Sequence, residues 1–373
     1  MIKITHSLSV NDKEKFMSNI VDDHWTSLNK KKESKSSSPK PYNNHSLVYK
    51  IETLISEYES GTHLNDIANK NKAINDIHID FLKYLTSDNY SNLKTCIKGN
   101  PTELEILSND IFSKFGFEIF EEQKKRGGIV GSKFSHLLLK RVFNYKSFRS
   151  SDKCIELYKK LDLEGKYCPY CNSNQFEIIS KEVPTKNKHV SQNGLLLFDL
   201  DHFFLKYKHP FLALAFYNLI PCCPSCNSRV RGDIDFSLNT HINPYDESFH
   251  EHFEFSLDKK SVLLSTMTKK LSKFDLRIDQ RPSSTRSEDI TCVDLKILHR
   301  LDSQIYKGDV ENIANTFLKY HNKKNENFVD TLHGINGQHV PLASKDISNV
   351  QRGKLKLDIV NIYREGSSLP LIT

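Results

Sequence analysis

Residues 195–233, LLLFDLDHFFLKYKHPFLALAFYNLIPCCPSCNSRVRGD, are the stretch from which the fold can be inferred. An apolar run at its start ends in two polar residues, Asp201 and His202, and Cys223 and Cys226 lie near its end. An ionisable group at the end of an apolar strand is costly to bury unless it has a partner or a chemical task. The two polar residues therefore mark a candidate site, and the cysteines indicate what holds it in place.

The cysteines form two C-x-x-C pairs, one at Cys168 and Cys171 and the other at Cys223 and Cys226. A gap of two residues lets both thiolates of a pair bind one ion, and two pairs complete a tetrahedral zinc site. A redox C-x-x-C needs only one pair, on a βαβ unit that the sequence does not indicate. Cys222 competes with Cys223 as a ligand, but the spacing from Cys223 to Cys226 fits better. We therefore predict a closed, structural zinc site made of four cysteines.

The polar residues near the second pair suit phosphodiester hydrolysis, which needs a base to activate water and a hard cation to stabilise charge on the phosphate. His202 has a suitable unperturbed pKa for the base, and Asp201 and Asn227 offer oxygen ligands for Mg²⁺. Asn218 can brace a loop through side-chain hydrogen bonds to the backbone. The alternative is that Asp201, His202 and Asn227 merely satisfy one another beside a structural metal.

This D-H … N … C-x-x-C-N order resembles the HNH endonucleases, whose catalytic module is the ββα-metal fold. Within that family, the neighbouring runs resemble stand-alone bacterial proteins of the retron- and Septu-associated anti-phage type. The runs are YKSFRSSDKC (145–154), CPYCN (168–172), LDHFF (200–204), HPFLALAFYNLIP (209–221), CPSCNS (223–228) and HINPYDESFHEHFEF (241–255). The likeness covers about 145–265 and hardly touches 1–140.

The resemblance implies a metal-dependent HNH endonuclease that hydrolyses DNA in anti-phage defence. Position by position, it makes His202 the general base and Asn218 the loop brace. It makes Asp201 and Asn227 the ligands of a catalytic Mg²⁺ or Mn²⁺, with Asn227 standing where many members have His. DNA is the expected partner, and an ATPase or another defence-system protein is left open as a second one.

Two basic regions are candidate DNA contacts. Arg229 and Arg231 follow Asn227 at the start of the expected helix, and we predict that they bind phosphates. Residues 124–153 carry nine Lys or Arg against one Asp, which suits either a face that follows a duplex or a solvated helix surface. His241 either lines the site or is a satisfied surface residue.

Composition favours a globular, cytoplasmic protein. The 373 residues include 22 Phe and 15 Tyr, and the formal net charge of +7 permits a nucleic-acid partner without requiring one. The start of the chain lacks the apolar segment of a secretory signal. The longest apolar run, 211–217, is far shorter than the ~20 residues of a membrane span. We therefore expect no membrane insertion.

The fold class predicted is α+β, with a ββα-metal nuclease core and its structural four-cysteine zinc site between helical flanks. Residues 1–145 are expected to be mostly helical with a solvated linker near 29–45, 146–265 to form the zinc-clamped core, and 266–373 to be mostly helical. Locally, Thr102 and Glu105 have the spacing of a capping box for a helix over 103–115. Phe253–Leu257 and Val262–Leu264 have the alternation of a hairpin.

Two rival functions stay open. A non-catalytic zinc module would bind nucleic acid or a partner without cleaving it, and an RNase would use the same site on RNA. One geometric criterion separates a nuclease from an inert module. In a nuclease, Asp201 and Asn227 should converge within reach of one ion, with His202 facing the same pocket.

Overall fold

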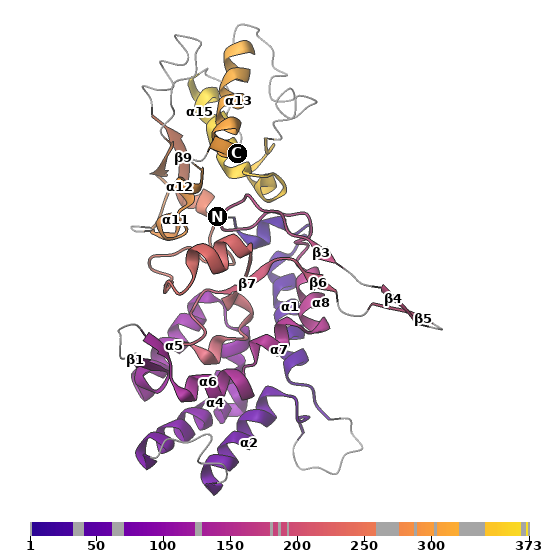
Figure 1. Ribbon diagram of the computed structural model, residues 1–373, viewed down its shortest axis with the longest axis vertical. Helices are drawn as coiled ribbons and strands as arrows, with labels where there is room; N and C mark the ends of the chain where they lie inside the picture. The colour runs from indigo at the N-terminus through magenta and orange to yellow at the C-terminus, as the bar shows by residue number, and fades with distance from the viewer. Residues whose placement is uncertain are drawn as a thin grey trace.

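The computed structural model describes residues 2–32, 41–61, 71–123, 129–179, 182–185, 188–191, 194–258, 276–286, 289–301, 304–320, 340–366 and 371. Helices α2, α4, α5 and α6 gather at one end of an elongated molecule and α13 and α15 at the other, with the strand β7 between them (Figure 1). Within the described residues every sheet is a two-stranded antiparallel pair. The predicted α+β class is therefore confirmed at this level.

The N-terminal part is mostly helical. Its α-helices are α1 (Lys13–Leu28), α2 (Leu47–Ser60), α4 (Lys72–Lys98), α5 (Pro101–Phe115), α6 (Lys133–Arg141), α7 (Tyr145–Arg149) and α8 (Asp152–Lys159). The short elements are η1 (Ile4–Ser7), η2 (Phe117–Ile119) and the paired strands β1 (Glu121–Gln123) and β2 (Ile129–Gly131). Backbone at 87–90 leaves the helical region and divides α4 in two.

The start of α5 corrects one local prediction. Asn100 caps the helix by accepting from the backbone N–H of Glu103 at 2.9 Å, and the Glu103 carboxylate accepts from the Asn100 N–H at 2.8 Å. The capping box is therefore Asn100–Glu103, and the pair Thr102–Glu105 was wrong. Pro101 explains the shift, because proline suits the first helical position, where its missing N–H would have no helical partner.

The centre of the molecule is the pair β7 (Asp199–His202) and β8 (Leu219–Cys222), in which Asp199 lies opposite Cys222 and His202 opposite Leu219. The connection between them contains η3 (Pro210–Leu212) and η4 (Phe216–Asn218). The helical segment η5 (Ser225–Arg231), with π geometry, follows β8. Two strands are therefore followed by a helical segment, and the second cysteine pair lies where β8 gives way to η5. Two further strand pairs are β3 (Ile178–Ile179) with β6 (Leu195–Leu196) and β4 (Glu182–Thr185) with β5 (Lys188–Ser191), the second of which projects away from the rest of the molecule (Figure 1).

The connection between β7 and β8 shares its core with the N-terminal helices. Phe211 lies in this connection, and its ring centroid is 5.3 Å from that of Phe120 and 6.0 Å from that of Phe81 on α4. All three side chains are fully buried. The helices therefore support the loop that connects the two central strands.

The C-terminal part combines helices with one strand pair. Its elements are α9 (Phe249–His252), β9 (Phe253–Leu257), β10 (Leu276–Gln280), α11 (Thr291–Asp294), α12 (Ile297–Leu301), α13 (Gln304–Tyr320), η6 (Ser344–Asn349) and α15 (Gly353–Gly366). The partner of β9 is β10, whereas the strand predicted at 262–264 lies outside the described residues. Helix α15 packs against β9 and α13, and its Asp358 accepts from the Phe255 N–H at 2.8 Å.

No helix in the described part of the chain is long and apolar enough to cross a membrane.

Candidate functional site

Four cysteines form one buried cluster. The Sγ atoms of Cys168, Cys171, Cys223 and Cys226 all lie within 4.8 Å of one another, and those of Cys171 and Cys223 are 3.8 Å apart. A tetrahedral ion with Zn–S bonds of about 2.3 Å holds its sulfurs about 3.8 Å apart. The cluster could therefore hold a metal ion such as zinc. The group includes Cys223 and not the neighbouring Cys222, as the spacing predicted.

Each cysteine pair is shaped by its own backbone and by distant segments. In the first pair, the Asn172 N–H donates to the carbonyl of Cys168 at 2.7 Å, and Asn172 has a left-handed φ of +51°. The Asn172 side chain donates to the carbonyl of Ile347 at 3.1 Å and accepts from the Lys354 N–H at 3.0 Å. The C-terminal part of the chain therefore fixes the first pair.

Polar groups around the cluster favour thiolates. The Cys223 N–H donates to the Cys168 sulfur at 3.3 Å, and Arg300 of α12 donates to the Cys226 sulfur at 3.2 Å. Among the four thiols, hydrogen bonds from the neighbouring sulfurs hold the pKa of Cys171 well below its usual range, whereas burial raises the pKa of Cys168 well above its own. Donors of this kind orient metal ligands and compensate their charge. The donor set therefore suits a metal that prefers thiolate sulfur.

His202 lies at the end of β7 with its ring fixed on both sides. Its Nε2 is 3.1 Å from the carbonyl oxygen of Ala213, and its ring meets that of Tyr145 edge-on with centroids 4.5 Å apart. Burial lowers the pKa of His202 to about 3, so the imidazole is neutral near pH 7. Because a carbonyl only accepts, Nε2 carries the proton and Nδ1 keeps its lone pair.

Asn218 makes the loop-bracing hydrogen bonds that were predicted for it. Its Oδ1 accepts from the Phe204 N–H at 2.6 Å, and its Nδ2 donates to the carbonyls of Phe204 at 3.2 Å and Leu212 at 3.0 Å. The side chain is fully buried. It therefore ties together the loop whose Ala213 carbonyl holds the imidazole of His202.

Asp201 is engaged by protein groups. Its Oδ2 accepts from the Tyr170 hydroxyl at 2.9 Å and forms an ion pair with Arg231 Nε at 3.0 Å. Both Asp201 and Arg231 are 2% exposed. Burial raises the pKa of Asp201, and the charge of Arg231 opposes that rise. A carboxylate held in this way has little capacity left for a metal ion.

Arg231 does not face solvent, which corrects its predicted role as a phosphate contact. Its Nη2 donates to the carbonyls of His202 at 2.7 Å and Phe203 at 2.9 Å. The guanidinium also lies over the Phe236 ring, 4.5 Å from the centroid. It therefore anchors η5 to the end of β7. Arg229, two residues earlier, is exposed and remains a candidate for phosphate contact.

Asn227 meets a residue that the sequence analysis missed. Its Nδ2 donates to Asp199 Oδ2 at 3.1 Å, and both side chains are half-buried. Asp199 and Asp201 share one face of β7 because residues two apart in a strand point the same way, whereas His202 points to the opposite face. The period-two alternation of D-L-D could have identified Asp199. The sequence predicted that Asp201 and Asn227 converge on one ion. Instead, Asn227 contacts Asp199, and Asp201 contacts Tyr170 and Arg231.

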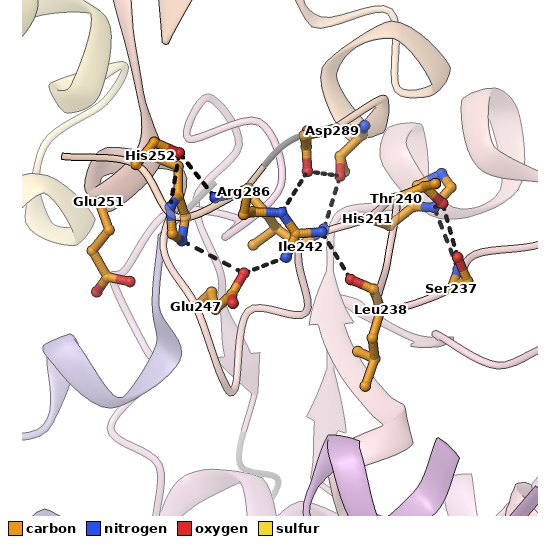
Figure 2. A network of polar contacts seen from close by, with 12 residues as sticks. Ser237, Leu238, Thr240, His241, Ile242, Glu247, Glu251, His252, Arg286 and Asp289 are labelled. Carbon is orange, nitrogen blue, oxygen red and sulfur yellow. Dashed lines mark hydrogen bonds and ion pairs between the residues drawn. The ribbon is translucent and has the colours of Figure 1, made fainter. Parts of the chain in front are cut away.

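Other predicted polar residues have structural partners. His241 is buried, not at the surface, with its Nε2 3.0 Å from Asp294 Oδ2 and its ring stacked on Phe236 at 4.0 Å. Figure 2 shows it in a polar network at whose centre Arg286 contacts Glu247 and Asp289. This network joins the segment after η5 to the C-terminal part, so it serves the fold.

Some of the basic side chains in the stretch 124–153 have partners within the protein. Arg141 makes two hydrogen bonds to Glu57, at 2.6 and 2.8 Å, and Arg149 donates to the carbonyls of Leu196 and Phe198. The basic residues at 124–126 lie outside the described residues. Lys133, Lys140 and Lys146 are exposed.

No protein-family model, curated protein or solved structure matches the chain. Among the described residues, the four cysteines form the only group of three or more His, Cys, Asp or Glu side chains close enough to share one ion.

Proposed function

We propose that this protein is a metal-dependent endonuclease of the HNH type that hydrolyses DNA. The observation that carries the proposal is the setting of His202. Its imidazole is held by the Ala213 carbonyl on a loop braced by Asn218, and no described residue hydrogen-bonds to its Nδ1. A neutral imidazole with a fixed ring and an available lone pair can act as a general base, but at a pKa of about 3 it is a weaker base than the near-neutral groups that suit this role best.

In this proposal Nδ1 of His202 accepts the proton of the attacking water. Asn218 is a positioning residue, since it contacts only the loop backbone. Tyr145 limits rotation of the imidazole through its ring contact and donates to the carbonyl of Leu200 in β7 at 3.1 Å. Each of these contacts lowers the cost of orienting the base during the reaction.

The catalytic cation is assigned to a revised pair of residues. Asp199 and Asn227 lie together and are half-buried, so water-bearing ions can reach them, whereas Asp201 is enclosed by Tyr170 and Arg231. Mg²⁺ and Mn²⁺ suit such a site because Mg²⁺ binds through one or two carboxylates and keeps several waters. When bound, the ion would stabilise charge on the phosphate and on the leaving oxygen.

Zinc is the metal we propose for the four cysteines, in a structural role, because all four positions of a tetrahedral ion would be filled by sulfur. Arg229 is the proposed phosphate contact beside Asn227. The assignment to anti-phage defence, with an ATPase or another defence-system protein as partner, rests on the motif resemblance alone.

Three observations favour the rival, a zinc-containing module that binds nucleic acid or a protein without cleaving it. The ion pair between Arg231 and Asp201 occupies the carboxylate next to His202, and His202 is only 7% exposed. His202 also points to the face of β7 opposite Asp199, so the imidazole and the proposed cation ligands do not face one pocket across the strand. The rival and the nuclease differ in whether scission follows binding.

The test is cleavage of supercoiled plasmid by the wild type, His202→Ala and His136→Ala, each with Mg²⁺, Mn²⁺ or chelator. His136 on α6 is exposed and serves as the matched control. We expect His202→Ala to lose about 10²–10⁴-fold in rate, His136→Ala to match the wild type, and chelator to abolish scission. Equal rates in all three proteins would overturn the role of His202. A gel shift without scission under any metal would favour the rival, and cleavage of single-stranded RNA alone would identify an RNase.

A further inference from the structure

A cavity of about 550 Å³ lies among the N-terminal helices, and His202 is not among its lining residues. Its walls come from the end of α1, the start of α2, α7, the start of α8 and Leu214 in the loop after β7. The volume lies within the range of pockets for small ligands, about 300–1,000 Å³. No motif in the sequence pointed to this cavity, because its walls are contributed by separate segments.

The cavity has an excess of positive charge. Lys30, Lys50 and Lys153 line it, and Asp152 is the one carboxylate among the lining residues that the structure describes. Lys50 is half-buried, and burial lowers its pKa. No ion pair joins Lys30 or Lys50 to a carboxylate of the described residues. Three ammonium groups against one lining carboxylate leave the cavity net positive, and a positively charged cleft attracts anions.

The lysines also lie close enough to affect one another. Burial lowers the pKa of Lys153, and the positive charge of Lys30 lowers it further. The Lys153 ammonium donates to the carbonyl of Ser27 at 2.9 Å, at the end of α1. That hydrogen bond uses one of its three donors, so two remain for a ligand. An anion between Lys30 and Lys153 would relieve their repulsion.

Two helices direct their N-termini to the same cavity. Ser46 is the N-cap of α2 and Ser151 the N-cap of α8, and both line the cavity. The N-terminus of a helix carries partial positive charge and favours anions. The two helix N-termini therefore favour a bound anion, as the lysines do.

The rest of the lining suits the organic part of a ligand. Leu28, Leu47, Val142, Phe148 and Leu214 supply apolar wall. Hydroxyls in the lining already donate to backbone carbonyls, so they offer a ligand acceptor oxygens rather than donors; they belong to Ser27, Ser46, Ser150 and Ser151. Nucleotides combine several negative charges with an organic body of this size.

We propose that this cavity binds a phosphorylated ligand of nucleotide size, with its phosphates at Lys30, Lys50 and Lys153. The phosphate can belong to a free nucleotide or to the end of a short strand, and the same lysines would hold it in either case. This proposal does not depend on the nuclease assignment.

The cavity touches the loop that holds His202. Leu214 lines the cavity, and its carbonyl lies 2.8 Å from Nε2 of His24 on α1. The adjacent carbonyl, that of Ala213, is the partner of His202. A ligand in the cavity would thus lie against the segment that orients the imidazole.

The experiment is calorimetric titration of the full-length wild type with ATP, inorganic pyrophosphate, adenosine and a 5′-phosphorylated dinucleotide. Lys50→Gln and the double variant Lys30→Gln/Lys153→Gln are compared with Lys15→Gln, an exposed lysine of α1 that does not line the cavity. Glutamine keeps most of the chain length and removes the charge, and circular dichroism checks that each variant folds.

We expect ATP to bind and adenosine to bind far more weakly. Affinity should fall about ten- to a hundredfold in Lys50→Gln and in the double variant, as for loss of a hydrogen bond to a charged group, and stay unchanged in Lys15→Gln. If the dinucleotide binds and ATP does not, the cavity is still a phosphate site, and its ligand is the end of a nucleic-acid strand. No binding of any phosphorylated probe, or equal affinity in wild type, Lys50→Gln and the double variant, would overturn the proposal. If Lys50→Gln does not fold, the double variant decides alone.

Discussion

Asp199 and Asp201 point the same way from one strand but have different surroundings. Asp201 is enclosed with Tyr170 and Arg231, and Asp199 is half-buried beside Asn227. The resemblance of the motif selected Asp201 because that residue precedes His202. The partners that occupy Asp201 come from residues 31 positions before it and 30 positions after it, which local spacing could not reveal.

This difference gives a stability prediction. Asp201→Ala should lower the free energy of unfolding by about 3–5 kcal/mol, because it leaves the buried guanidinium of Arg231 without its ion-pair partner. Asp199→Ala should change it by less than about 1 kcal/mol, since the side chain is half-buried and its partner is a neutral amide. Urea unfolding followed by circular dichroism measures both. Similar losses in the two variants would contradict the assigned surroundings.

The same pair gives a prediction for activity. Asp199→Asn should reduce Mg²⁺-dependent plasmid cleavage and raise the Mg²⁺ concentration that gives half the maximal rate, because a carboxylate ligand becomes a neutral amide. The control is Asp152→Asn, an exposed carboxylate at the start of α8. An unchanged Mg²⁺ dependence in Asp199→Asn would remove this residue from the cation site.

At the scale of elements, the helix predicted over 103–115 matches α5, and the apolar run that ends at Asp201 contains β6 and most of β7. Boundaries were less accurate. Asn100 and Pro101 both favour a helix start, but the S/T-x-x-E spacing directed attention to Thr102. Glu105 instead accepts from the Leu238 N–H at 3.2 Å, a long-range contact that no local pattern contains.

The helix start can be tested with a matched pair of variants. Asn100→Ala should cost about 1 kcal/mol of unfolding free energy, the usual loss for an N-cap. Thr102→Ala should cost only a few tenths, since Thr102 is exposed inside the first turn. Thermal and urea unfolding distinguish the two. A larger loss in Thr102→Ala would place the cap where the sequence pattern had it.

At the scale of the whole molecule, distant segments meet at the cysteine cluster. The Ile2 N–H donates to the carbonyl of Pro169 at 2.8 Å, and the Tyr167 N–H donates to that of Ser348 at 3.0 Å. A residue near the N-terminus and a residue of η6 therefore hydrogen-bond to the segment that carries the first cysteine pair. These contacts could not be predicted from sequence because they join residues far apart in the chain. What could be predicted was the set of four sulfurs, since metal ligands have a characteristic spacing.

Buried histidines make the stability of the whole molecule depend on pH. His78 of α4 is stacked on Phe134 at 3.7 Å, and burial lowers its pKa to about 4. The unfolded chain binds more protons than the folded one between about pH 6.5 and 4, so stability falls as pH falls through that range. Going from pH 7 to 5, His78 alone should cost about 2 kcal/mol.

The test compares His78→Gln with His136→Gln, which removes an exposed histidine. The decrease in unfolding free energy from pH 7 to 5 should be smaller in His78→Gln by about 2 kcal/mol. Buried carboxyl groups such as Asp358 have raised pKa values, which make stability rise as pH falls. Comparing the two variants separates the contribution of His78 to the pH dependence from theirs. Equal pH dependence in both variants would contradict a neutral, buried His78.

The zinc content of the purified chain tests the central claim most directly, namely that the four cysteines bind one metal ion that supports the site. Elemental mass spectrometry should find about one zinc per chain in the wild type and in Cys96→Ser, a buried free cysteine outside the cluster, and clearly less in Cys171→Ser. Full zinc in Cys171→Ser, or no zinc or other thiolate-bound metal in the wild type, would contradict the account.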